Sequence, residues 1–204
     1  MKHIHLKLLL KSIITAVTLT SLIAFIPFEK SCKNISQDVF RLHIIANSNN
    51  TDDQELKLKV RDAILKQTDS LYQNAHSIIE AKKLTSENLS LILNTAKNTI
   101  TENGYSYDVN AEITNMHFDT RHYDNITMPS GQYDALRVTI GKASGKNWWC
   151  VMYPALCVGS ASNYQELEEN LTPEEYAILT GSGTQYELKF KVVEYFEKIT
   201  SYLQ

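Results

Sequence analysis

The sequence predicts an α+β domain: an antiparallel sheet of about four strands with helices packed on it, preceded by an N-terminal hydrophobic export or anchor segment. Residues alternate between apolar and polar at 39–47, 105–118, 133–142 and 148–153, which is typical of strands. Apolar residues recur at helical spacing in segments between and after these strands. This order of elements favours a layered fold in which helices cover the sheet on at least one face.

The N-terminal segment has the pattern of an export signal. Lys2, Lys7 and Lys11 precede an uncharged, mostly apolar run from Ser12 to Phe28. The run is longer than a usual signal core and shorter than a full membrane span of about 20 residues. We therefore expect residues 1–30 to be a signal peptide or signal anchor and residues 31–204 to form a single exported domain.

The composition is that of an ordinary globular domain. Apolar residues make up 43% of the 204 residues, which is enough for a core. The formal charge is only −3 and no cluster of lysine and arginine is present, so we expect no nucleic-acid partner. No phosphate-binding loop, dinucleotide fingerprint or known metal motif is present, and we expect no cofactor.

The first predicted strand, residues 39–47, has two different faces. One face carries Arg41 and His43. The other is wholly apolar and should meet the core; it comprises Phe40, Leu42, Ile44 and Ala46.

Two helices are expected after this strand. The first has Thr51 as its N-cap, and Gln54 three residues later completes a capping box. The helix dipole favours Asp52 and Asp53 in its first turn. The second helix carries an apolar stripe from Leu89 to Ile100 and ends near Gly104.

The second half of the sequence reads as strands followed by helices. Residues 117–132 form a predicted loop, and residues 133–142 the next strand. The turn-like segment 143–147 favours a hairpin that pairs this strand with residues 148–153. A short helix from Pro173 to Gly181 and a last amphipathic helix over residues 188–203 complete the chain.

Few residues resemble catalytic or metal-binding groups. His43 with Asp52 or Asp53 could serve as a base with its orienting acid, although first-turn acids and a lone strand histidine are more often structural. A cation site is conceivable in the loop around 117–124, but its polarity is also what any exposed loop shows. The residues concerned are His117, Asp119, His122 and Asp124.

The uncharged stretch 148–158 holds both tryptophans and two of the three cysteines. Cys150 and Cys157 could form a disulfide outside a reducing compartment, or could remain two buried thiols. Trp148 and Trp149 could pack in the core or contact a partner.

Three stretches of the sequence resemble one family. "RLHIIANSNNTDDQELKLKVRDAIL" and "MPSGQYDALRVTIGKASGKNWWCVMYPALC" are similar to the two signature blocks of stage II sporulation protein R of endospore-forming bacteria, and "ELKFKVVEYFEK" is similar to its C-terminal segment. Two departures stand out: Phe118-Asp119-Thr120 replaces an expected Phe-Pro-Thr, and Pro154-Ala155 replaces two prolines.

The resemblance implies a signalling protein that is not itself an enzyme. Such proteins are made in the forespore and exported into the space between the two cells, secreted or held by the N-terminal segment. There they activate a membrane-embedded aspartic-type protease of the mother cell, which processes pro-sigma E. The rival interpretations are an exported hydrolase that acts on cell wall or peptides through His43 and a nearby acid, and a purely structural envelope protein.

The signalling interpretation requires a surface that binds a protein partner, and a ligand activates a receptor only by preferring its active state. The turn after the first strand, the loop at 121–131 and the aromatic stretch are the candidate surfaces. Their candidate partner-binding residues are Asn47, Asp53, Arg121, Tyr123, Trp148 and Trp149.

Overall fold

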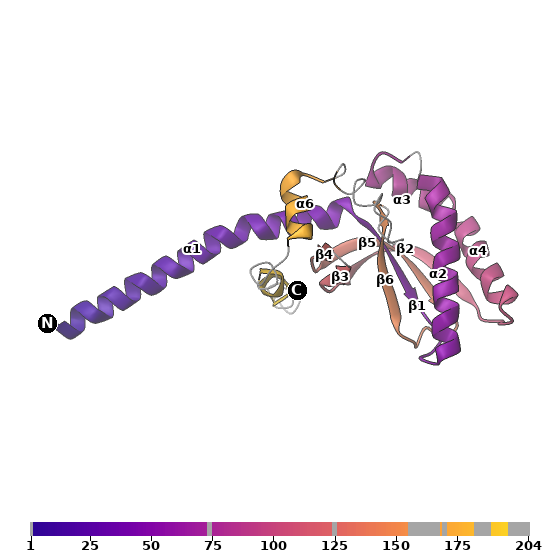
Figure 1. The fold of residues 1–204 in the computed structure, drawn as a ribbon, viewed down its shortest axis with the longest axis horizontal. Coiled ribbons are helices and arrows are strands. Elements are labelled where there is room, and N and C mark those ends of the chain that lie inside the picture. The colour runs from indigo at the N-terminus through magenta and orange to yellow at the C-terminus, as the bar shows by residue number, and fades with distance from the viewer. Residues whose placement is uncertain are drawn as a thin grey trace.

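The computed structural model describes residues 2–72, 75–123, 126–154, 168, 171–181 and 189–195. Its elements follow one another in the order α1 (Lys2–Asp38), β1 (Phe40–Ile45), α2 (Thr51–Tyr72), α3 (Ile78–Glu87), α4 (Leu89–Glu102), β2 (Val109–Phe118), β3 (Arg121–Tyr123), β4 (Ile126–Met128), β5 (Gly131–Ile140), β6 (Asn147–Tyr153) and α6 (Pro173–Thr180). Residues 189–195 are also helical. Figure 1 shows α1 extending far from the rest of the chain.

The predicted α+β fold with a four-stranded sheet is confirmed. The strands lie in the order β2-β5-β1-β6. β2 pairs with β5 and β6 pairs with β1 in antiparallel fashion, whereas β1 and β5 are parallel. The sheet is therefore mostly antiparallel, with one parallel pair at its centre.

The expected hairpin between residues 133–142 and 148–153 is wrong. β1 lies between β5 and β6, and these two strands do not pair with each other. The period-2 pattern predicted both strands, but a short connection does not reveal that a third strand occupies the space between them.

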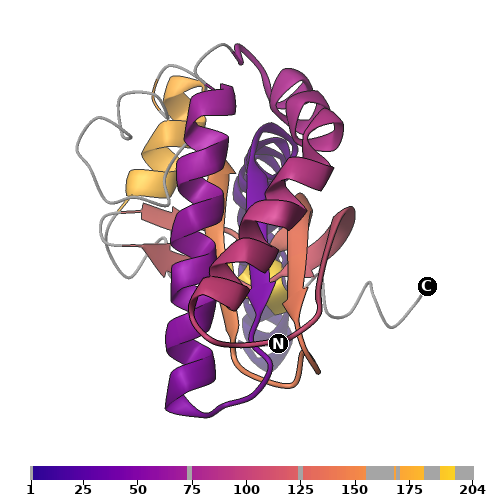
Figure 2. The same ribbon diagram turned by 90° about the vertical axis from the view of Figure 1, so that its right-hand side faces the viewer.

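Helices α2, α3 and α4 cover one face of the sheet, and Figure 2 shows α2 and α4 in front of it. The apolar face of β1 meets these helices as predicted. Packed together there are the fully buried Phe40, Leu42, Ile44, Val60, Ile64, Ile92, Ala96, Leu136 and Val138.

The other face of the sheet is covered as well. The last turns of α1, the small β3–β4 hairpin, α6 and residues 189–195 lie on it. As a result, all six residues of β1 are buried, including Arg41 and His43. The sequence predicted helices on at least one face; the second cover comes from segments near the two ends of the chain.

Helix α1 serves two environments. Its N-terminal two-thirds exposes large apolar side chains, among them Leu9, Ile13, Ile23 and Ile26. Residues Lys7–Asp38 are long and apolar enough to cross a membrane, as a signal or anchor segment would be. The same helix then continues past residue 30, the expected domain boundary, and packs into the core through Phe28, Cys32 and Ile35.

Three local predictions need correction. Thr51 lies inside α2, and the Gln54 side chain donates to the Ser48 carbonyl (2.8 Å) instead of completing a capping box. An additional helix, α3, precedes the predicted second helix, with Ser77 as its N-cap. The predicted loop 117–132 contains the β3–β4 hairpin.

The connection from β5 to β6 crosses over the end of β1. The Gly145 amide donates to the Ala46 carbonyl (2.9 Å), the Ser144 hydroxyl to the Asn47 carbonyl (2.7 Å), and the Lys142 amide to Asn47 Oδ1 (3.0 Å). A Cβ atom on Gly145 would lie 2.2 Å from the Ser48 carbonyl oxygen. The crossing therefore requires glycine at position 145.

We expect Gly145→Ala to lower the free energy of unfolding by about 2–3 kcal/mol, because the added methyl group overlaps a backbone atom. Urea denaturation followed by circular dichroism measures the change. Ala143→Gly in the same connection is the control: Ala143 has a φ of 50°, which suits glycine, so the change should stay below about 1 kcal/mol. Equal effects of the two substitutions would show that the connection can move away from β1.

Candidate functional site

The turn between β1 and α2 is fixed by the side chain of Asp53. Its Oδ2 accepts hydrogen bonds from Asn47 Nδ2 (2.8 Å) and Ser48 Oγ (2.5 Å). Asn47 in turn holds the β5–β6 connection. Asn47 and Asp53, two of the predicted partner-binding residues, thus have a structural role at this end of the sheet.

The protonation state of Asp53 follows from these bonds. Partial desolvation would raise the pKa of Asp53, but hydrogen bonds from Ser48, Asn47 and Tyr107 hold it below its ordinary value. Asp53 is buried and charged at neutral pH, and its carboxylate serves the turn.

The two tryptophans point to opposite faces of the edge strand β6. Trp148 lies on the side of α2, where the Arg61 guanidinium stacks 4.2 Å from its ring centroid. Trp149 lies on the other side and stacks on His43 with parallel rings 3.8 Å apart, while Arg121 lies 5.5 Å from its centroid. Both rings are partly buried, so each packs against the domain and retains an accessible part.

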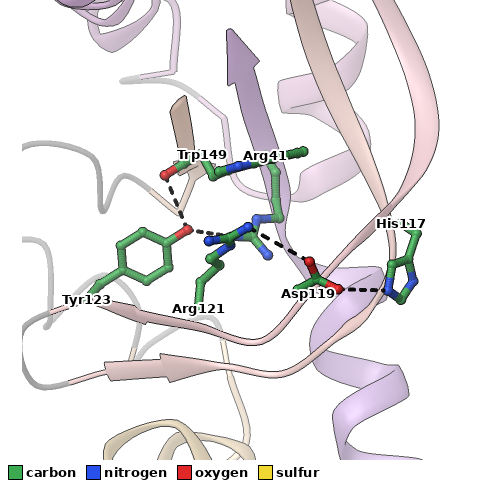
Figure 3. A network of polar contacts seen from close by, with 6 residues as sticks. All are labelled: Arg41, His117, Asp119, Arg121, Tyr123 and Trp149. Atoms are coloured by element: carbon green, nitrogen blue, oxygen red, sulfur yellow. Dashed lines mark hydrogen bonds and ion pairs between the residues drawn. The ribbon is translucent and has the colours of Figure 1, made fainter. Parts of the chain in front are cut away.

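Arg41 is a fully buried cation in an aromatic enclosure. Its Cζ lies 4.1 Å from the ring centroid of Phe118, 4.8 Å from that of Tyr133 and 5.9 Å from that of Tyr123. Nη2 donates to the Tyr123 hydroxyl (2.5 Å), which donates to the Trp149 carbonyl (3.3 Å). Figure 3 shows this chain of contacts.

The charge of Arg41 is poorly compensated. Nε and Nη1 have no hydrogen-bond partner, and no carboxylate pairs with Arg41 among the described residues. Burial lowers the pKa of Arg41, and the nearby charge of Arg121 lowers it further. A cation–π contact contributes about 2 kcal/mol when desolvated, whereas removing one ion from water costs several kcal/mol. The cation–π contacts and the hydrogen bond to the Tyr123 hydroxyl therefore balance the desolvation cost of Arg41 without a clear surplus.

Three partly exposed polar residues, His117, Asp119 and Arg121, lie near Arg41 on the β3 side. Asp119 Oδ2 is 3.9 Å from Arg121 Nη2, and its Oδ1 is 3.7 Å from His117 Nε2. Further buried polar atoms without a hydrogen-bond partner are Thr120 Oγ1, Arg121 Nε and Ser130 Oγ. Polar groups buried in this way are uncommon in folded proteins and call for an explanation.

His43 lacks the surroundings of a catalytic base. It is 3% exposed, and neither ring nitrogen makes a hydrogen bond of good geometry. Burial lowers the pKa of His43, Asn147 opposes part of this shift, and the charge of Arg137 adds to it. Asp53, the acid suggested as its orienting group, accepts from Asn47 and Ser48 instead. The histidine is thus a neutral stacking partner of Trp149.

The remaining predicted residues are placed as follows. Arg121 and Tyr123 come together with Trp149 around Arg41, whereas Asn47, Asp53 and Trp148 lie elsewhere. Cys150 is disulfide-bonded, but Cys157 lies outside the described residues, so their pairing stays a prediction. His122 contacts Thr127 across the β3–β4 hairpin (3.0 Å). Within the described ranges, no three histidine, cysteine or acidic residues gather as a metal site; Asp124 is outside them.

Sequence reasoning missed Arg41 as a site residue. An arginine in the middle of a strand that is apolar on its other face was a usable signal, since arginine is almost never fully buried unless paired. The aromatic residues around it come from β2, β3 and β5, and no local pattern links these segments.

Comparison with known proteins is consistent with the resemblance in sequence. The family described as stage II sporulation protein R (spore_II_R) matches residues 36–163. The chain is 35% identical to stage II sporulation protein R of Bacillus subtilis (strain 168) over 135 residues, which are 66% of this chain and 60% of the relative. The match thus spans less than two-thirds of that relative's length. No solved structure matches.

We expect Asp53→Asn to lower the free energy of unfolding by about 2 kcal/mol, because a neutral amide replaces the charged acceptor of two short hydrogen bonds. Asp52→Asn is the matched control: Asp52 is exposed in the same helical turn, and its substitution should cost less than about 1 kcal/mol. Urea denaturation at pH 7 compares the two. A smaller loss for Asp53→Asn than for Asp52→Asn would contradict the role of Asp53 in the turn.

A second prediction concerns acid stability. Because the pKa of His43 is lower in the folded than in the unfolded chain, the unfolded chain binds the proton more tightly. Its contribution to stability is complete above about pH 6.5 and decreases as the pH falls below that value. His43→Phe keeps a ring against Trp149 and should reduce this decrease between pH 7 and pH 5, measured by urea denaturation. An unchanged pH dependence would show that His43 takes up a proton without penalty.

Proposed function

Because the chain belongs to the stage II sporulation protein R family, we propose that it is an exported signal between the two cells of a sporulating bacterium. In this proposal the forespore exports the protein into the intermembrane space. There it activates a membrane-embedded aspartic-type protease of the mother cell, which processes pro-sigma E. The protein acts by binding and performs no chemistry itself.

The observation that carries the proposal is the extent of the family match, residues 36–163. It includes β1, the turn held by Asp53, the connection from β5 to β6 that crosses over β1, and β6 itself. The N-terminal helix supports export, because its exposed apolar side chains suit a signal or anchor segment. The placement of His43 against Trp149 removes the main support for the hydrolase interpretation.

The proposed mechanism is selection of an active receptor state. A ligand shifts a receptor toward activity only to the extent that it binds the active state more tightly. The candidate contact surface is the β3 side of the domain, where Arg121 is 39% exposed and Trp149 is partly exposed. Arginine and tryptophan are the residues that most often dominate binding energy at protein interfaces.

The test is reconstitution in non-sporulating cells. The receptor protease and pro-sigma E are co-expressed with the full chain, with a chain that lacks residues 1–28, or with His43→Phe, and processing is followed by immunoblot. We expect processing with the exported chain and with His43→Phe, and none without export. Absence of processing by a folded, exported chain would refute the proposal, and loss of activity in a folded His43→Phe variant would favour the hydrolase interpretation.

The same assay tests the contact surface. Arg121→Ala should reduce processing at least about tenfold if Arg121 is an interface anchor. Arg137→Ala is the matched control, because Arg137 is also 39% exposed and, among the described residues, is likewise paired with one acid, Glu112 at 3.1 Å. Both variants must be exported to the same level. Equal processing by the two would move the contact surface away from β3.

A further inference from the structure

We propose that Arg41, Arg121 and Tyr123 form a binding site for a carboxylate group of a partner protein. The proposal rests on unsatisfied donors, on the local charge and on the shape of the surrounding residues.

The first observation is a set of unsatisfied donors on two neighbouring arginines. Arg41 is fully buried, and its Nε and Nη1 carry N–H groups without an acceptor. Arg121 Nε is buried and unpaired as well. Figure 3 shows both arginine side chains reaching toward the Tyr123 hydroxyl, and the charge of Arg121 acts on Arg41. Two neighbouring guanidinium groups with unused donors are the groups that bind an oxyanion most strongly.

The second observation is the local charge. Arg41 and Arg121 are both cations, since guanidinium groups stay protonated in proteins. Asp119 is the acid in contact with this pair among the described residues, 3.9 Å from Arg121. Among the described residues, these three groups leave one positive charge uncompensated, and one carboxylate would neutralise it. A phosphate, with close to two negative charges at neutral pH, would exceed it.

The third observation is the enclosure. Phe118 and Tyr133 flank the Arg41 guanidinium, and the Tyr123 hydroxyl fixes its Nη2. Trp149 lies next to Arg121 and is stacked on His43. These neighbours hold the Arg41 guanidinium in one orientation, and guanidinium groups bind planar carboxylates in bidentate fashion. Arg121, 39% exposed, gives the site its side toward solvent.

The partner group is the side chain of an aspartate or glutamate presented by a protein. That the protein is the receptor protease rests on the proposed function; binding of the carboxylate does not. An assay with the chain alone therefore separates failure of this inference from failure of the signalling proposal.

The test uses Trp149 as the reporter. The chain has two tryptophans, so Trp148→Phe leaves Trp149 as the single one. The full chain with this substitution, in detergent solution at pH 7 and fixed ionic strength, is titrated with N-acetyl-glutamic acid amide, whose side-chain carboxylate is free. N-acetyl-glutamine amide is the neutral probe of equal size, and inorganic phosphate is the alternative anion. Fluorescence of Trp149 is recorded in each titration.

We expect a saturable change with the glutamate probe and none with the glutamine probe. Arg41→Met should weaken the response about tenfold or more, and Arg121→Met should do the same. Because the Arg121 side chain is 39% exposed, this second variant decides the question if Arg41→Met does not fold. Arg61→Met is the matched control, because Arg61 stacks on Trp148 on the opposite face, and it should leave the response unchanged. The proposal is overturned by no saturable response, by a response that survives Arg121→Met, or by tighter binding of phosphate than of the carboxylate probe.

Discussion

The position of β1 between β5 and β6 is the constraint on which the rest of the structure depends. Both edges of β1 pair with other strands and both of its faces are covered, so all six of its residues are buried. The chain can reach β6 from β5 only by crossing over the end of β1. The hydrogen bonds of Asn47 and the missing side chain of Gly145 make that crossing possible. Asp53 then holds Asn47, so the first turn of α2 is part of the same arrangement. The turn that the sequence suggests as a partner surface also has a structural role, because Asn47 and Asp53 hold this end of the sheet together.

The sequence predicted the elements better than their neighbours in space. Alternation predicted β1, β2, β5 and β6 and the apolar face that meets α2 and α4, because burial of one face acts on every second residue. It did not predict that β1 separates β5 from β6, since pairing depends on contacts between distant segments. The same limit applies to the site. Arg121, Tyr123 and Trp149 were suggested from their residue types, but their meeting around Arg41 requires three segments to fold together.

The burial of the Arg41 charge lowers the stability of the isolated domain. For the stability of the isolated domain, an apolar residue at this position would avoid the loss of hydration of a buried charge. The surrounding rings and the Tyr123 hydroxyl reduce that loss and hold the guanidinium in one orientation. His43 fits this environment because it remains neutral, whereas the charge of Arg137 would repel a charged ring. The second face of the sheet thus combines an apolar core near α1 and α6 with a polar region near β3.

Helix α1 passes from its exposed apolar stretch into the core without an intervening loop, and it packs there through Phe28, Cys32 and Ile35. A helix whose end is packed in the core couples the orientation of the domain to that of its apolar stretch, apart from any bend at Pro27. If the apolar stretch is embedded in a bilayer, a tilt of this helix turns the domain with it. The domain would then reach its partners by lateral diffusion in the membrane, with its orientation to the bilayer largely fixed. Cleavage of α1 before its packed end would release the domain, which would then diffuse and rotate freely in three dimensions.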